Sequence, residues 1–342
     1  HCADNDLAVA VAQTDSKGDR SKRPSEQSHP DYYLRVVERR KNGIVVRGAK
    51  MHTSVSVNSN ELIVLPTRNF DEADKDYAVA FAVPMNTKGL KLVTSTYVQE
   101  RDSEFQFPLS AKHRMLETVT IFDDVFVPTE RVFLDGEHQF SGALALGFVD
   151  YHRFTAVSYK QPLLDLLVGS ALLMADYNGI SKVGHVRDKL TWLMAYSESV
   201  KGLLKTAARE CITMKPGLAV PNRLYTNVAK FQFAHNYHHA LALVQDITGG
   251  LLVTMPAEED FANPETGKHL EHYLGGRQGV SALDRLRAIN MISDLTTSEF
   301  GGYHAVLAIH AEGSVEAEKL AIFREFDAKA VMAYAKKMSG NG

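Results

Sequence analysis

Cysteine is nearly absent from this 342-residue sequence, which contains only Cys2 and Cys211. Two distant cysteines without a CxxC pair cannot build a disulfide framework or a cysteine-rich zinc site. Long apolar runs are also missing, because a stretch such as Ser141–Val149 is far shorter than the roughly 20 residues that cross a bilayer. We therefore expect a protein of the reducing cytoplasm that has no membrane span.

Charge of one sign is equally scarce, since the formal net charge is only -3. Such a balance predicts no general attraction to nucleic acid or to an anionic membrane. Apolar residues make up 45% and charged residues 23%, which is typical of a folded globular protein of about two domains. The start at His1 is neither an initiator methionine nor a signal peptide, so we expect the natural N-terminus to be missing.

The first part of the chain has the pattern of short strands bounded by Gly, Pro, Asn, Asp or Ser, without intervening helices. Asn42-Gly43 separates two of these strands and predicts a hairpin, because both residues tolerate positive φ angles. Such a series favours a barrel or a sandwich. The predicted strands are Leu7–Val11, Tyr33–Glu38, Gly43–Arg47, Glu61–Leu65, Tyr77–Pro84, Leu90–Thr94 and Thr118–Val127.

After about Gly136 the pattern changes to apolar residues at helical spacing. We therefore predict an α+β protein with a β-barrel domain at 1–136 and an antiparallel helical bundle at 137–342. The predicted helices are Gln161–Tyr177, Val186–Ala208, Leu224–Ile247, Asp284–His310 and Val315–Ala335.

Three polar segments could bind a ligand. The loop that contains Thr14 and the loop that contains His52 and Ser54 offer hydroxyl and imidazole groups, although both are compatible with solvated loops. The turn Asp246–Gly250 contains paired glycines that let a backbone approach a phosphate. The same turn is also the ordinary C-terminal cap of a helix.

Candidate catalytic groups stand near the start of the helical half. His152 could act as a base near neutral pH, and Lys160, eight residues later, lies on a similar helical face. Glu117 begins a strand. Structural roles remain open for all three. The histidines within 235–239 lack a nearby carboxylate or thiolate, so we predict no metal site there.

Five segments in the same order resemble the 4-hydroxybutyryl-CoA dehydratase branch of the 4-hydroxyphenylacetate 3-hydroxylase family. The resemblance runs through nearly the whole chain. The segments are VVERRKNGIVVRGAK at 36–50, VNSNELIVLPT at 57–67, VTIFDDVFVPTERVFL at 119–134, HVRDKLTWL at 185–193 and QDITGGLLVTMP at 245–256.

The resemblance implies an acyl-CoA dehydrogenase-like fold, of which this chain is expected to hold the middle β domain and the C-terminal bundle but not the N-terminal domain. It also implies FAD and a homotetramer. By the same resemblance His152, Glu117 and Lys160 are the catalytic residues. The implied flavin-binding residues are Thr14, His52, Ser54, Asp246, Thr248, Gly249 and Gly250.

The sequence departs from this branch at the residues of its [4Fe-4S] cluster. His152 matches a cluster histidine, but Tyr159 stands in place of a ligand cysteine and Ala156 in place of a tyrosine. A cluster needs about four ligands, usually thiolates, so we predict that this chain does not hold one. The branch's C-terminal glutamate aligns with either Glu312 or Leu307.

Three functions are compatible with these features. The first is flavin chemistry on an acyl-CoA by dehydration or, without the cluster, by moving a double bond as in vinylacetyl-CoA to crotonyl-CoA. The second is hydroxylation of a phenol by reduced flavin taken from a partner reductase. The third is a non-catalytic relative that binds flavin or acyl-CoA, against which the retained Glu117, His152 and Lys160 argue.

Overall fold

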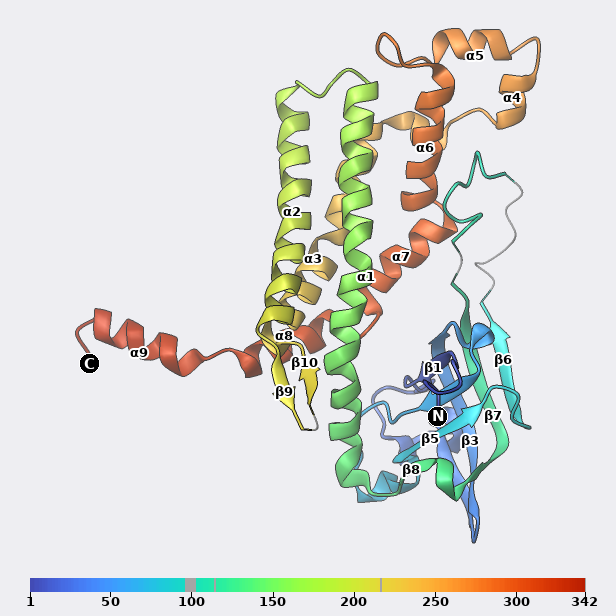
Figure 1. Cartoon of the computed structure of the whole chain (residues 1–342), viewed down its shortest axis with the longest axis vertical. Coiled ribbons are helices and arrows are strands. Elements are labelled where there is room, and N and C mark those ends of the chain that lie inside the picture. The colour runs from blue at the N-terminus through green and yellow to red at the C-terminus, as the bar shows by residue number, and fades with distance from the viewer. Residues whose placement is uncertain (96–102, 114, 216, 342) are drawn as a thin grey trace. The chain divides into compact units, whose positions relative to one another are not determined.

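The computed structural model describes residues 1–95, 103–113, 115–215 and 217–341. The chain folds into two compact units (Figure 1). One, the β unit, comprises His1–Glu100 and His113–Val149, and the other, the helical unit, comprises Arg101–Lys112 and Asp150–Gly342. A short piece of chain between two strands of the β unit therefore belongs to the helical unit.

The described strands of the β unit form two four-stranded sheets, ordered β1-β4-β5-β8 and β2-β3-β7-β6. Alternate residues are buried along much of the long strands, as expected for sheets that cover a common core. The predicted α+β class is confirmed, but the barrel is not, because the described strands close no barrel. The strands are β1 (Val9–Ala12), β2 (Arg35–Arg40), β3 (Gly43–Ser54), β4 (Glu61–Val64), β5 (Val79–Pro84), β6 (Leu90–Thr94), β7 (Glu117–Pro128) and β8 (Val132–Asp135).

The predicted hairpin joins β2 to β3, with its turn one residue earlier than expected. Arg40 pairs with Gly43, so Lys41 and Asn42 form the two-residue loop. Gly43 is needed because its φ is 157° and a Cβ there would collide with the backbone oxygen of Val127 on β7.

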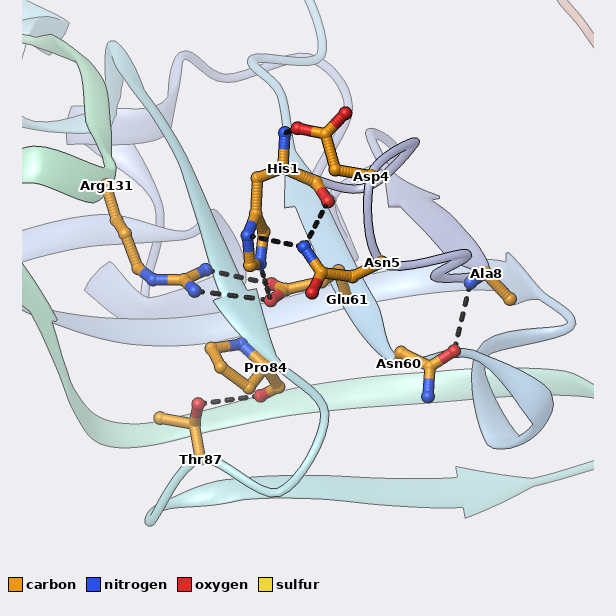
Figure 2. A network of polar contacts seen from close by, with 9 residues as sticks. All are labelled: His1, Asp4, Asn5, Ala8, Asn60, Glu61, Pro84, Thr87 and Arg131. Carbon is orange, nitrogen blue, oxygen red and sulfur yellow. Dashed lines mark hydrogen bonds and ion pairs between the residues drawn. The ribbon is translucent and has the colours of Figure 1, made fainter.

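The N-terminal segment is tied to the β unit through Glu61, whose carboxylate is buried (Figure 2). Arg131 donates two hydrogen bonds to this carboxylate, at 2.8 and 3.2 Å. His1 lies 3.7 Å from the same group, and the side chain of Asn60 accepts a hydrogen bond from the backbone of Ala8. These contacts hold β1 in register beside β4, with which it pairs in parallel.

In the helical unit α2 and α3 pack side by side, and side chains of α1 share their apolar core (Figure 1). None of the described helices is long and apolar enough to cross a membrane. The elements from 141 onward are α1 (Ser141–Tyr177), α2 (Gly184–Arg209), β9 (Ile212–Met214), β10 (Leu218–Val220), α3 (Arg223–Thr248), α4 (Glu258–Ala262), α5 (Gly267–Tyr273), α6 (Ala282–Thr296), α7 (Glu299–His310), α8 (Val315–Glu325) and α9 (Ala328–Met338).

Helix boundaries differ from the prediction in two ways. First, α1 begins twenty residues before the predicted Gln161 and continues through Pro162. Polar residues and glycines had masked its first half. Second, the two C-terminal helices are each divided. Ser298 caps α7 by accepting hydrogen bonds from two backbone N–H groups, and Asp327 caps α9 by accepting one, from the backbone N–H of Ala330.

A buried ion pair supports the β unit next to two of the predicted ligand loops. The Lys50 ammonium lies 2.8 Å from the Asp15 carboxylate, and both side chains are at most 3% exposed. Lys50 also donates to the backbone oxygens of Gln13 and Leu65, at 2.9 and 3.0 Å. Burial lowers the pKa of Lys50, and the charge of Asp15 opposes that shift. The pair thus fixes the segment around residue 14 beside the end of β3.

We expect Lys50→Met to lower the free energy of unfolding by about 3–5 kcal/mol, because it leaves the buried Asp15 carboxylate without its countercharge. Lys91→Met is the matched control, since Lys91 pairs with Asp123 on the surface of the same unit. It should cost less than about 1 kcal/mol. Urea unfolding of both variants measures the difference. Equal losses would show that burial of the Lys50 pair has no special importance.

Candidate active site

The β unit brings two of its predicted site residues together. Ser54 and Glu117 face each other at the ends of β3 and β7, and the Ser54 hydroxyl donates a 2.7 Å hydrogen bond to the Glu117 carboxylate. Beneath them lies a buried chain of hydroxyl groups on Thr53, Thr118 and Thr120. Hydrogen bonds among these side chains therefore hold the polar end of β3 and β7 in a defined arrangement.

The backbone around His52 is strained. His52 and Val55 have φ values of 58° and 54°, a region that non-glycine residues rarely occupy and that is costly for a β-branched side chain. Met51 donates its N–H to the carbonyl oxygen of Thr14 at 2.7 Å, which joins the two predicted ligand loops. The side chain of His52 is exposed. Strain of this kind is common in binding loops.

In the helical unit, Lys160 of α1 donates a 2.7 Å hydrogen bond to one carboxylate oxygen of Glu312. These side chains are 4% and 3% exposed. The other oxygen of the carboxylate accepts a 3.1 Å hydrogen bond from the phenol of Tyr159. Glu312, one of the two residues that could align with the branch's glutamate, is therefore placed directly against Lys160.

Protonation in this cluster is set mainly by burial. Burial lowers the pKa of His152, which the charge of Glu312 opposes and the charges of Lys160 and Arg153 reinforce. Burial likewise lowers the pKa of Lys160, against the effect of Glu312. On α7, burial and then Lys160 lower the pKa of His304 to about 4. Both imidazoles are consequently favoured in the neutral form, which can accept a proton.

A second buried pair lies beside the first and was not predicted from the sequence. Lys230 of α3 and Glu318 of α8 are both fully buried, 3.5 Å apart. Neither carboxylate oxygen of Glu318 has a hydrogen-bond partner. Arg153, also buried, donates to Asn227 at 2.6 Å. The sequence shows only that Lys230 and Glu318 lie in helices. Whether they are buried and paired depends on how these helices pack, which the sequence does not reveal.

The turn Asp246–Gly250 ends α3. Gly249 has a φ of 86° and donates its N–H to the carbonyl of Gln245, so it does act as the helix cap. The Thr248 hydroxyl bonds back to the carbonyl of Val244, and Asp246 pairs with Lys189. A Cβ at Gly249 or Gly250 would meet nothing within 4 Å. The turn is thus a cap whose surface is open to a ligand.

Each unit by itself presents polar groups of the kind that bind a flavin, whereas the residues present do not fit an iron–sulfur cluster. In the β unit, the exposed imidazole of His52 is available to hydrogen-bond a ring or a phosphate. In the helical unit, the absence of a side chain at the glycine turn lets such a ligand approach the backbone closely. Tyr159, at the position of a cluster cysteine, instead binds the Glu312 carboxylate. In the described part of the chain, no three His, Cys, Asp or Glu side chains gather as a metal site.

Family profiles match most of the chain. The profile described as "4-hydroxyphenylacetate 3-hydroxylase N terminal" matches residues 1–134, and the one described as "4-hydroxyphenylacetate 3-hydroxylase C terminal" matches residues 141–340. The chain belongs to the 4-hydroxyphenylacetate 3-hydroxylase family. The prediction that the family's N-terminal domain is missing is wrong, because the N-terminal profile is matched.

The relatives include enzymes of two kinds. The chain is 34% identical to 4-hydroxybutyryl-CoA dehydratase/vinylacetyl-CoA-Delta-isomerase of Clostridium aminobutyricum, over 98% of this chain and 71% of the relative. It is 32% identical to the 4-hydroxyphenylacetate 3-monooxygenase oxygenase component of Thermus thermophilus, over 87% of this chain but only 62% of the relative.

Solved structures agree in fold. A crystal structure of an oxygenase component of 4-hydroxyphenylacetate 3-monooxygenase complexed with FAD has a TM-score of 0.91 and 28% identity, covering 98% of this chain and 70% of that one. Butyryl-CoA dehydrogenase from Megasphaera elsdenii has a TM-score of 0.56 at 14% identity, over 92% of this chain and 66% of that one. The acyl-CoA dehydrogenase-like fold is confirmed.

The stability of the protein should depend on pH through Glu318. Burial raises the pKa of its carboxyl group from 4.5 to about 7, against the opposing charges of Lys230 and Arg153. Below pH 4.5 the group is protonated in both folded and unfolded chains. Between pH 4.5 and 7 only the folded chain retains the proton, so unfolding becomes easier by about 1.4 kcal/mol per pH unit, or roughly 3 kcal/mol in all.

Glu318→Gln should remove this fall, so that its stability exceeds that of the natural chain most clearly above pH 7. Glu316→Gln on the exposed side of the same helix is the control and should leave the pH dependence unchanged. Thermal unfolding from pH 5 to 8.5 measures both. The explanation fails if Glu318→Gln retains the full pH dependence.

Proposed function

We propose that this chain belongs to a FAD-dependent enzyme that shifts the double bond of an acyl-CoA, as in the conversion of vinylacetyl-CoA to crotonyl-CoA. The observation that carries the proposal is the grouping of His152, Lys160 and Glu312 within the helical unit. The 34% identity with a relative named for both dehydratase and isomerase activities supports the choice of substrate. Because the chain does not fit the cluster, isomerisation is favoured over dehydration.

The proposed chemistry is a transfer of one proton. His152, neutral because of burial, removes the acidic proton next to the thioester carbonyl. The electron pair of that C–H bond passes into the conjugated carbonyl and alkene. A proton then returns to the terminal carbon, the double bond moves next to the carbonyl, and no net oxidation occurs. Glu117 is the alternative base.

The surrounding charges assist the protonated state of His152. The carboxylate of Glu312 favours the imidazolium that forms when the substrate proton is taken up. Lys160 fixes that carboxylate by its 2.7 Å hydrogen bond. FAD, when bound, supplies a redox-active ring system at the site. Thr14, His52, Ser54 and the turn that includes Asp246, Thr248, Gly249 and Gly250 are the residues proposed to hold it, in a homotetramer.

His152→Ala should abolish crotonyl-CoA formation, because the proton acceptor is lost, while FAD remains bound. His185→Ala, which changes an exposed histidine of α2, is the matched control. Turnover of vinylacetyl-CoA is measured on the purified full-length protein, with flavin, iron and acid-labile sulfide assayed in the same sample. Full activity of the His152 variant would remove this residue from the mechanism.

Hydroxylation of a phenol is the second candidate function. It is favoured by the close structural match to an oxygenase component crystallised with FAD. Hydroxylation by reduced flavin also requires no iron–sulfur cluster. A separate flavin reductase would be the partner. If this function holds, the protein supplied with chemically reduced flavin consumes oxygen with a phenol and forms a catechol. Formation of hydrogen peroxide alone, without catechol, would count against it.

A further inference from the structure

Three side chains of one helix hold a single residue of the turn between α7 and α8. Lys160 and Tyr159 donate to the two carboxylate oxygens of Glu312, at 2.7 and 3.1 Å. Arg153, about two helical turns earlier on α1, donates to the backbone oxygen of Glu312 at 2.9 Å. Both ends of Glu312 are therefore attached to α1.

This attachment holds Glu312 in a strained conformation. Its φ is 60°, in the left-handed region that side chains rarely occupy. The next residue, Gly313, has a φ of 110°, and a Cβ there would stand 2.6 Å from the guanidinium of Arg153. A turn that needs this much support to place one carboxylate is typical of a functional position rather than of an ordinary connection.

Tyr159 differs from the other two donors because its side chain is 52% exposed. More than half of such a tyrosine stays in contact with water, and a hydrogen bond at an accessible position contributes little to folding. Two donors, one on each oxygen, do however fix the rotation of a carboxylate. The hydroxyl of Tyr159 is thus better suited to orienting Glu312 than to stabilising the fold.

We propose that Tyr159 is a positioning residue whose phenol, together with Lys160, fixes the carboxylate of Glu312 on the face of α1 that also carries His152, seven residues before Tyr159. The inference rests on the proposed function, in which His152 accepts the substrate proton. A charge held at a fixed position favours the imidazolium, whereas a carboxylate free to rotate away does so less. The position that carries a cluster cysteine in the dehydratase branch here serves to orient an acid.

The test compares Tyr159→Phe, Glu312→Gln and the double variant in the full-length protein loaded with FAD. The pKa of His152 is followed by NMR of histidine-labelled protein and assigned with His152→Gln. Glu312→Gln should lower that pKa, because it removes the charge that raises it. Tyr159→Phe should shift the pKa in the same direction, and the double variant should shift it no further than Glu312→Gln.

Kinetics supply the second readout. Tyr159→Phe should lower kcat with vinylacetyl-CoA by about tenfold, the equivalent of one hydrogen bond, and leave KM and flavin content unchanged. Tyr273→Phe, which changes a more exposed tyrosine on α5, should alter neither readout. If Glu312→Gln does not fold, the single change at Tyr159 and its control still decide the question.

The two proposals fail in different ways. An unchanged pKa of His152 in Tyr159→Phe, or shifts that simply add in the double variant, overturns the positioning role. If the variants show the coupled pKa shifts but the unchanged protein does not convert vinylacetyl-CoA, the positioning role is supported and the isomerase function is overturned.

Discussion

The burial of paired charges is the constraint on which both units depend. A charge removed from water is tolerated only if a partner and hydrogen bonds replace its hydration. In the β unit Asp15 and Lys50 meet this condition, and in the helical unit Lys160 and Glu312 do so. Each pair joins segments distant in sequence. Each pair is also associated with a non-glycine residue in the left-handed region. In the β unit this is His52, two residues after Lys50, and in the helical unit it is Glu312, a member of the pair.

Apolar packing supplies the rigidity that these pairs need. Leucine, alanine and aromatic side chains of α1, α2 and α3 fill one continuous core, in which residues such as Leu164, Leu193 and Phe233 are almost fully buried. The Lys160 ammonium lies 5.9 Å from the centroid of the Phe233 ring, and its side chain is almost fully buried. The ammonium can therefore reach few positions, and its hydrogen bond to Glu312 becomes a fixed feature of the helix.

Much of the fold followed from the sequence, because strand and helix periodicities are local properties. The α+β class and the hairpin at Asn42 were predictable. The sheets were not separable from a barrel, since closure depends on pairing between distant strands. The early start of α1 was hidden by its polar residues. In the candidate site, His152 and Lys160 were singled out by residue type, spacing and resemblance, and their roles stay predictions. Glu312 remained ambiguous with Leu307, and nothing in the sequence indicated the burial of Glu318. Their partners come from helices far apart in the chain.

The two buried pairs of the helical unit differ in how fully their carboxylates are hydrogen-bonded, and this difference indicates separate roles. Glu312 accepts hydrogen bonds on both oxygens, so its burial is largely compensated. Glu318 has only a cation at 3.5 Å and no hydrogen bond. A fold selected for stability alone would replace such a carboxylate with an apolar side chain. Yet Glu318 stands close enough to Glu312 and Arg153 for their charges to act on it. Above about pH 7, where Glu318 is ionised, its carboxylate offsets the positive charge of Lys230 and Arg153, and so leaves the Glu312 carboxylate to interact with Lys160 and His152.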